Sequence, residues 1–328
     1  MLDITYMGGG ASAEGAGGGS AEEFDTSNGK WHVRVGQRCG GGNAGAKIHM
    51  GVACRSDGTQ SPPQECIVKS ASSTDPDMLR ELEVLRKCRD MGRPITLGMT
   101  GKDYYLGESV RSGRLTLVFR WGPKDLAEHF GTGNQPERQC APQTVGLVVQ
   151  IAIGTLDALK NLHDAGYVHC DIKPKNILFD ESNNAITIID FGGAVEINGN
   201  GRERSWEYSA PEQWARAKCT RRTDAFAVVG ILIYLLTGCA PFVAEGEAGY
   251  MEHCRQLCEE VCKETESSHR ELFLDRTKHL HDIQHCCGVD GNHGLRHLLW
   301  MGMTRPLDTR WSCDKLKVEL GNILKRPE

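Results

Sequence analysis

Three stretches in the first quarter of the chain alternate apolar and polar side chains. Residues 31–39 (WHVRVGQRC), 47–56 (KIHMGVACRS) and 64–70 (QECIVKS) follow the period of two that gives a β-strand one buried face. A fourth apolar run, 114–121 (RLTLVFRW), ends at a Gly-Pro pair that breaks the pattern. These patterns predict a small sheet before residue 122.

Residues 75–89 have helical spacing instead. Met78, Leu82 and Leu85 recur at intervals of three and four. Asp75 is a favoured N-cap residue, and the proline after it suits a first helical turn. The sequence therefore predicts a helix between the third and fourth strands.

The chain beyond Pro123 is predicted to be mainly helical. Residues 141–166 have the pattern of one long amphipathic helix, and two short apolar strands, 176–179 and 185–190, flank the turn DESNN. The most apolar window, 225–242, is broken by Thr-Gly-Cys-Ala-Pro before it reaches the ~20 residues of a membrane span, which favours a buried core helix. A sheet-rich segment followed by a larger helical one predicts an α+β fold with two lobes and a ligand-binding cleft between them.

Composition and charge narrow the classes of function. The net charge of −5 arises in the first 29 residues, which hold five acids and no Lys or Arg, because acids and bases balance over the rest. Without a basic excess, no electrostatic binding of nucleic acid is expected. Residues 1–30 include the run GGGASAEGAGGGS and are expected to form a flexible acidic tail without a signal peptide. The 14 cysteines favour free thiols in the cytoplasm or nucleus, and no membrane association is expected.

A glycine cluster lies between the first two predicted strands. Gly40, Gly42 and Gly45 form the pattern G-x-G-x-x-G, which alone is a weak signal and more often a plain loop. Its place between two strands, rather than before a helix, disfavours a dinucleotide-binding site. Further along, Lys69 ends an apolar strand, where its ammonium group needs an anionic partner unless it is exposed. Glu81 on the following helix is the expected partner.

The segment HCDIKPKN, residues 169–176, carries the most specific signal. Asp171, Lys173 and Asn176 follow an apolar lead, and Asp190 of the tripeptide DFG comes after a short hairpin. That hairpin can bring both aspartates to one site. Two carboxylates beside a triphosphate repel it unless metal ions intervene, so a nucleotide site here requires magnesium. The alternative, a solvated turn, leaves the downstream motifs unexplained.

Those motifs are SAPE at 209–212, Asp224 in DAFAVVG and Arg310 in DTRW. With them, the chain resembles a eukaryotic-type protein kinase of the serine/threonine kind over roughly residues 32–325. The resemblance implies a bilobal fold, with a small β-rich N-lobe at about 31–121 and a larger helical C-lobe at about 122–328. Together the lobes would form a protein kinase domain over 31–328.

The resemblance also implies catalytic roles. Asp171 would accept the proton of the substrate hydroxyl, and Lys173 would contact the γ-phosphate. Lys69, paired with Glu81, would hold the α- and β-phosphates of ATP. Asn176 and Asp190 match the two Mg²⁺ ligands of the family. Further matches concern nucleotide binding: the glycine cluster (Gly40, Gly42, Gly45) over the phosphates, and Phe119, Arg120 and Trp121 beside the adenine.

Other matches are structural. The resemblance implies that Glu212 and Arg310 form a buried ion pair, that Asp224 tethers the catalytic loop, and that Ser205 contacts it.

Cys170 departs from the family pattern, because many members have an arginine before the catalytic aspartate. That arginine pairs with a phosphate on the activation segment. Cysteine has no such charge, so we expect the chemistry to survive and this dependence on phosphorylation to be lost. The glycine cluster departs too, since Lys47 stands where valine is usual.

An extended Cys/His-rich segment spans about 243–298. Cys254, Cys258 and Cys262 share a helical stripe with leucine and valine, which is typical of a structural core. The absence of a C-x-x-C pair argues against the alternative of a zinc site. The segment could equally bind a partner or dock a substrate.

These observations predict an ATP- and Mg²⁺-dependent serine/threonine kinase with protein substrates. One alternative is a pseudokinase that acts as an ATP-binding scaffold, although pseudokinases usually lose residues of the Lys69, Asp171 or Asp190 type. The other is a small-molecule phosphotransferase of related fold. Such enzymes generally lack the APE motif and the partners matched by Asp224 and Arg310.

Overall fold

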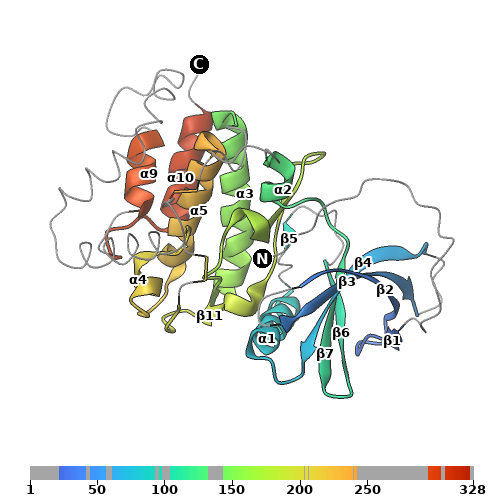
Figure 1. Ribbon diagram of the computed structural model, residues 1–328. Helices are drawn as coiled ribbons and strands as arrows, with labels where there is room; N and C mark the ends of the chain where they lie inside the picture. Colours follow the sequence, from blue (N-terminus) through green and yellow to red (C-terminus); the bar gives the residue numbers. More distant parts are fainter. Residues whose placement is uncertain are drawn as a thin grey trace. The chain divides into compact units, whose positions relative to one another are not determined.

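The computed structural model describes most of the chain after residue 21. The described residues are 22–41, 45–56, 61–92, 96–97, 104–131, 143–202, 204–205, 207–238, 240–241, 295–303 and 307–325. They form two compact units. The first unit contains the described residues up to Leu85 and those from Tyr104 to Gly122. The second contains the described residues from Arg86 to Leu97 and from Pro123 onward. The first unit is rich in strands and the second is mainly helical (Figure 1).

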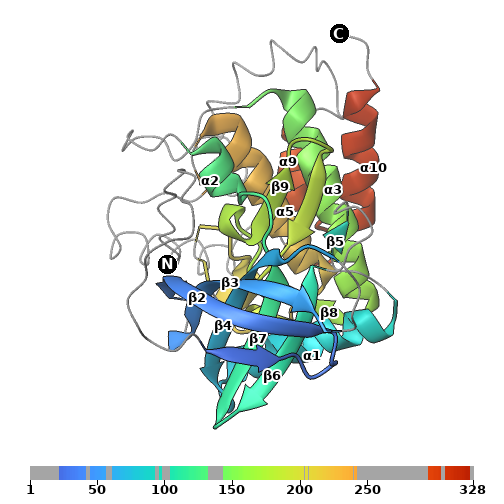
Figure 2. The ribbon, with the colours of Figure 1, turned by 90° about the vertical axis from the view of Figure 1, so that its right-hand side faces the viewer.

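The first unit is built on a six-stranded antiparallel sheet with the strand order β1-β2-β3-β4-β7-β6. Figure 2 shows these strands side by side. The strands are β1 (Glu23–Asp25), β2 (Trp31–Gly41), β3 (Lys47–Arg55), β4 (Gln64–Ser72), β6 (Tyr105–Arg111) and β7 (Arg114–Arg120), and helix α1 (Pro76–Asp90) follows β4. The four predicted strands and the predicted helix are therefore confirmed.

Alternate residues of these strands meet in one apolar cluster. Trp31 and Val33 of β2 pack with Ala53 of β3, Val68 of β4 and Val118 of β7. The period of two thus places one face of every strand in the core, as the sequence pattern indicates.

The first strand corrects the predicted tail. Phe24 is 4% exposed and joins the same apolar cluster, and β1 pairs with β2. The backbone N–H of Ser27 donates to Glu108 O at 2.6 Å, and the Asn28 amide donates to Leu106 O at 3.0 Å. Residues 23–28 therefore connect β2 with β6, and the flexible tail predicted for 1–30 is wrong from Glu23 onward. Residues 1–21 lie outside the described residues.

Strand β6 was not predicted because Gly107 interrupts its alternation. Gly107 has φ +150°, and a Cβ there would lie 2.9 Å from the Cβ of Thr26. The N-terminal segment therefore packs directly on the backbone of β6, which only glycine allows.

The second unit surrounds helix α3 (Val145–Asp164) and helix α5 (Arg221–Thr237). Its other helices are α2 (Leu126–Phe130), α4 (Pro211–Trp214), α9 (Leu295–Met303) and α10 (Cys313–Leu324). Its strands are short: β5 (Thr96–Leu97), β9 (Ile177–Asp180) and β10 (Ala185–Ile188) form one sheet, and β8 (Tyr167–Val168) pairs with β11 (Val195–Glu196). The loops between β8 and α4, which carry Asp171 and Asp190, belong to this unit.

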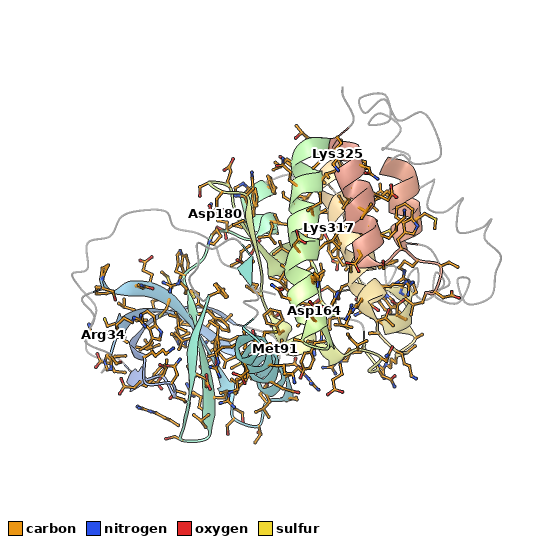
Figure 3. All side chains as sticks on the ribbon, turned by 180° about the vertical axis from the view of Figure 1, so that it is seen from behind. Arg34, Met91, Asp164, Asp180, Lys317 and Lys325 are labelled. Atoms are coloured by element: carbon orange, nitrogen blue, oxygen red, sulfur yellow. The ribbon has the colours of Figure 1, made fainter. Side chains whose placement is uncertain are left out.

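The core prediction for the most apolar window is confirmed. Helix α5 is capped by the Thr220 side chain, ends at Gly238 with φ +81°, and is buried at every position from Ala225 to Leu236. Helix α3 passes the length and composition test for a membrane span, but its apolar residues pack on α5 and α10 inside this unit. Asp157 of α3 also forms an ion pair with Lys317 of α10, and Figure 3 labels Lys317 on that helix.

Candidate active site

The first unit contains the predicted ion pair between β4 and α1. Lys69 Nζ lies 2.7 Å from Glu81 Oε2, with the two side chains 16% and 3% exposed. Asp75 begins the helix by accepting the backbone N–H of Met78 at 2.9 Å, which fixes the turn that carries Glu81. Burial, and then the Glu81 carboxylate, raises the pKa of the neighbouring Tyr104 phenol. The pair therefore holds a partly accessible cation beside a buried carboxylate.

The glycine cluster is described only at its two ends. Gly40 belongs to β2 and pairs with Ile48, Gly45 has φ +85°, and Gly42 lies outside the described residues. Lys47 opens β3 and is exposed, whereas its neighbours Ala46 and Ile48 are buried. The departure from valine at position 47 thus puts a solvated cation at the start of this strand.

Strand β7 ends with Phe119 and Arg120, and Trp121 follows it. Phe119 is 6% exposed, and its ring centroid lies 5.5 Å from that of Tyr104. The backbone N–H of Arg120 donates to Tyr104 O at 2.7 Å, and that of Trp121 donates to Glu65 O at 3.0 Å. Both N–H groups are therefore used within the unit, and a bound base would have to contact other atoms of these residues.

In the second unit, three polar side chains surround the Asp171 carboxylate: Lys173 and Asn176 from the segment after β8, and Ser205 from the segment before α4. Lys173 Nζ donates to Asp171 Oδ2 at 2.9 Å, and Ser205 Oγ donates to Oδ1 at 2.6 Å. Lys173 also donates to Ser205 Oγ at 2.9 Å. The amide of Asn176 donates to Asp171 O at 2.8 Å and to Oδ2 at 3.2 Å. These contacts fix the carboxylate, which is 4% exposed.

Asp224 of α5 binds backbone N–H groups of the loop that carries Asp171. Its carboxylate accepts the N–H of His169 at 2.9 Å, the N–H of Cys170 at 3.0 Å and His163 Nε2 of α3 at 2.8 Å. Burial raises the pKa of Asp224, but the hydrogen bond and charge of His163 and the contacts of His169 outweigh it, so the pKa lies below its ordinary value. A buried carboxylate with three donors can hold Cys170 at φ +62°, which is costly for a residue other than glycine.

The buried imidazole of His169 links the two motifs. Its Nδ1 accepts the Asp171 backbone N–H at 3.2 Å, so Nε2 carries the hydrogen that Ile189 O accepts at 3.2 Å. Burial lowers the pKa of His169 despite the nearby aspartates, which agrees with a neutral ring. Its centroid lies 5.3 Å from that of Phe191. The DFG segment is thereby tied to the catalytic loop.

The two predicted magnesium ligands lie at the ends of neighbouring segments. The backbone N–H of Ile189 donates to Asn176 O at 2.9 Å, which brings Asp190 next to Asn176. Asp190 has left-handed backbone angles (φ 67°, ψ 72°). Because the amide nitrogen of Asn176 is used by Asp171, its amide oxygen is the atom that can face a cation.

This donor set fits Mg²⁺, which binds one or two protein oxygens and keeps waters and phosphate oxygens as its other ligands. No cluster of three His, Cys, Asp or Glu side chains that could hold a metal occurs among the described residues. Residues 242–294, with most of the segment considered for zinc or for docking, lie outside them.

Cys170 is buried in an apolar cluster with Val168 and Cys219. A hydrogen bond with the Cys219 thiol, and then burial, raises the pKa of Cys170. The Gln213 amide donates to Cys170 O at 2.7 Å and to Arg202 O at 3.1 Å. The position thus presents a packed, neutral thiol rather than a cation.

Glu212 and Arg310 form the buried ion pair that the resemblance implied. Arg310 Nη1 and Nη2 contact the two carboxylate oxygens at 2.8 and 3.0 Å, and Thr223 Oγ1 donates to Oε1 at 2.8 Å. Burial raises the pKa of Glu212, but the Arg310 guanidinium outweighs it, so this pKa lies below its ordinary value.

The sequence did not single out two residues that complete this arrangement. His163 ends α3 and bonds to Asp224, and Gln213 joins Cys170 to Arg202. The only sequence signal for His163 was a polar residue on an apolar helical face. Gln213 directly follows the APE motif and carried no signal of its own.

Comparison with known proteins agrees with this geometry. The protein kinase domain family matches residues 65–315, more than half of the chain, so the chain belongs to this family. The chain is 34% identical to serine/threonine-protein kinase pkn3 of Myxococcus xanthus, over 33% of this chain and 22% of pkn3. It is 33% identical to PknH of Mycobacterium tuberculosis (strain ATCC 25618 / H37Rv), over 32% of this chain and 17% of PknH.

A third relative is the probable serine/threonine-protein kinase SCO3848 of Streptomyces coelicolor, which is 30% identical over 48% of this chain and 23% of its own length. The chain therefore spans about a fifth of the length of the curated relatives it matches. The family implies ATP as a substrate, usually with Mg²⁺, and protein substrates.

Proposed function

We propose that this chain is a serine/threonine protein kinase that transfers the γ-phosphoryl group of ATP to a protein hydroxyl. The observation that carries the proposal is the set of contacts around Asp171. One carboxylate oxygen accepts Ser205 Oγ, and the other accepts Lys173 Nζ. A base of this reaction must be fixed within reach of the hydroxyl, and a cation must lie beside it for the transferring phosphoryl group.

Each residue then has a defined task. Asp171 accepts the proton of the substrate hydroxyl as its oxygen attacks the γ-phosphorus. Lys173 stabilises the charge of the phosphoryl oxygens, and Asn176 keeps the Asp171 carboxylate in place through its amide nitrogen. Lys69, in the first unit, binds the α- and β-phosphates. Asn176 and Asp190 would hold Mg²⁺, which would neutralise the charge of the phosphates.

Two observations favour this function over a catalytically inactive scaffold. The Lys69–Glu81 ion pair is formed, and Asp171 contacts both the Lys173 ammonium group and the Ser205 hydroxyl group. The preference for serine or threonine over tyrosine rests on Lys173, as the family resemblance implies. Binding of a protein substrate to residues 243–298, and a cytoplasmic or nuclear location, are part of the same proposal.

Phosphoryl transfer from γ-labelled ATP with Mg²⁺ tests the proposal directly. The acceptors are the protein itself, a serine- and a tyrosine-containing basic peptide, and a small alcohol, with Asp171→Asn as the control. Transfer to serine that falls by roughly 10²–10⁴-fold in Asp171→Asn would support the assignment of the base. Nucleotide binding without transfer would favour the scaffold, and transfer to the alcohol alone would favour a small-molecule phosphotransferase.

A further inference from the structure

An arginine of the activation segment lies against the backbone of the DFG turn. Arg204 Nη2 donates to Gly192 O at 3.0 Å. A Cβ at Gly193 would lie 2.8 Å from Arg204 Cδ and 2.9 Å from its Nε. The stem of Arg204 therefore crosses Gly193 at a distance that only glycine permits without a shift of the arginine.

The next residue contacts the other half of the site. Ser205 bonds Asp171 and Lys173, and the backbone N–H of Arg204 donates to Ser209 Oγ at 3.4 Å. Two consecutive residues thus reach the magnesium-binding turn on one side and the catalytic loop on the other. A shift of Arg204 would therefore move both Asp190 and Ser205.

Cys170 has no positive charge with which to order the activation segment. A protein kinase that carries a cation before its catalytic aspartate can order the activation segment through a phosphate. Here that position is a neutral thiol buried with Cys219. Arg204 supplies a cationic, multiply donating group from the activation segment itself, and its acceptor is a backbone carbonyl that needs no modification.

From these contacts we infer that Arg204 is a positioning residue for phosphoryl transfer, which holds the 190–193 turn against the catalytic loop without an activating phosphate. The inference rests on the proposed function for its kinetic part. Gly193 is the other partner in this contact, because a side chain at position 193 would occupy the space that the arginine stem fills.

The test compares Arg204→Met, Arg204→Lys, Gly193→Ala and the double variant Arg204→Met/Gly193→Ala. Lys218→Met is the control for the loss of a positive charge, since Lys218 is exposed and contacts neither Asp171 nor the 190–193 turn. Each protein is treated with a phosphatase first. Activity is measured as kcat and KM for peptide, with a Mg²⁺ titration, and amide exchange of the peptide covering 190–195 is the second readout. That peptide includes the Ala194 N–H, which donates to Phe191 O at 3.0 Å.

Arg204→Met is expected to lower kcat about tenfold or more, to require more Mg²⁺ and to leave KM for peptide unchanged, because a charged hydrogen bond is lost. Exchange at 190–195 should quicken. Arg204→Lys, which retains a donor, should recover most of both. Gly193→Ala should match Arg204→Met, and the double variant should be no worse than either, because both changes break one contact. Lys218→Met should behave as wild type.

Equal losses in Arg204→Met and Lys218→Met, or additive losses in the double variant, would overturn the inference. Exchange at 190–195 that is unchanged in Arg204→Met would overturn it as well. If the unmodified wild type transfers no phosphate above the Asp171→Asn background, the proposed function fails instead, and the exchange measurement still decides whether Arg204 holds the turn.

Discussion

Each unit of this protein contains a buried ion pair, and the two pairs differ in how completely they are enclosed. Arg310 is 0% exposed and binds both oxygens of Glu212, which also accepts a threonine hydroxyl. Lys69 contacts one oxygen of Glu81 and remains 16% exposed. Both pairs place a cation beside a buried glutamate, but only the second leaves part of the cation in contact with solvent.

The difference indicates which pair can take part in chemistry. A guanidinium whose donors are all directed into the protein can stabilise a fold, but it cannot bind a ligand. An ammonium group fixed by one buried carboxylate is held in place, and its accessible side can meet a phosphate. The comparison therefore favours a structural role for Glu212–Arg310 and supports the proposed role of Lys69–Glu81 in nucleotide binding, and four experiments test this division.

The largest expected effect is on stability. Arg310→Met leaves Glu212 as an uncompensated buried carboxylate, which should lower the free energy of unfolding by about 3–5 kcal/mol. Urea denaturation measures it. The double variant Glu212→Gln/Arg310→Met should recover part of the loss, because no charge is then left buried. A loss below about 1 kcal/mol in the single variant would contradict the structural assignment.

The next effect is on activity alone. Lys69→Arg keeps the charge and a partner for Glu81, so the free energy of unfolding should stay close to wild type. The guanidinium places its charge differently from the ammonium, and transfer should fall about 10²-fold. The rate of phosphoryl transfer and the urea midpoint are measured on the same preparation. Full activity in this variant would remove the reason to assign Lys69 to the phosphates.

A smaller effect concerns pH. The folded-state pKa of Glu212 lies below its ordinary value of 4.5, so the unfolded chain binds its proton first as the pH falls. The stabilisation by this pair is therefore complete above about pH 4.5 and is lost as the pH falls through the folded pKa. Unfolding free energies measured from pH 7 downward should fall less steeply in Glu212→Gln/Arg310→Met. Parallel curves would mean that other carboxylates, such as Asp224, account for the acid sensitivity.

The smallest effect is expected at the surface pair of Glu23 on β1 and Arg34 on β2. Arg34 Nε lies 2.6 Å from Glu23 Oε1, but the side chains are 67% and 41% exposed. Water screens such a pair, so Arg34→Gln should leave the urea midpoint within experimental error. A change as large as that of Arg310→Met would show that distance, rather than enclosure, sets the value of these pairs.

Much of the fold could be predicted from the chain. The strands β2, β3, β4 and β7 and the core helix α5 have strong periodicity or long apolar runs, which local sequence reports directly. Strand β1 was missed because its three residues are too few to show a period. Strand β6 was missed because Gly107 breaks its alternation. The place of β1 depends on Phe24 reaching a core that also includes Leu106 and Val118, which lie far along the chain.

The candidate site divides in the same way. Lys69 and Glu81 were predicted as an ion pair, and Asp171 and Asn176 were predicted to share one polar site because the segment HCDIKPKN is specific. The roles of His163 and Arg204 were not, because each depends on a contact with a residue that is distant in sequence or on the absence of a side chain at Gly193.

The sequence by itself determined the strands β2, β3, β4 and β7, the helices α1, α3 and α5, the family and the identity of the polar residues around Asp171, since periodicity and motif spacing are local properties of a chain. The tertiary structure decided which of two similar ion pairs is enclosed, that residues 23–28 belong to the sheet, and that Arg204 lies on Gly193. Enclosure depends on what every neighbouring element contributes to one place, and no local pattern contains that information.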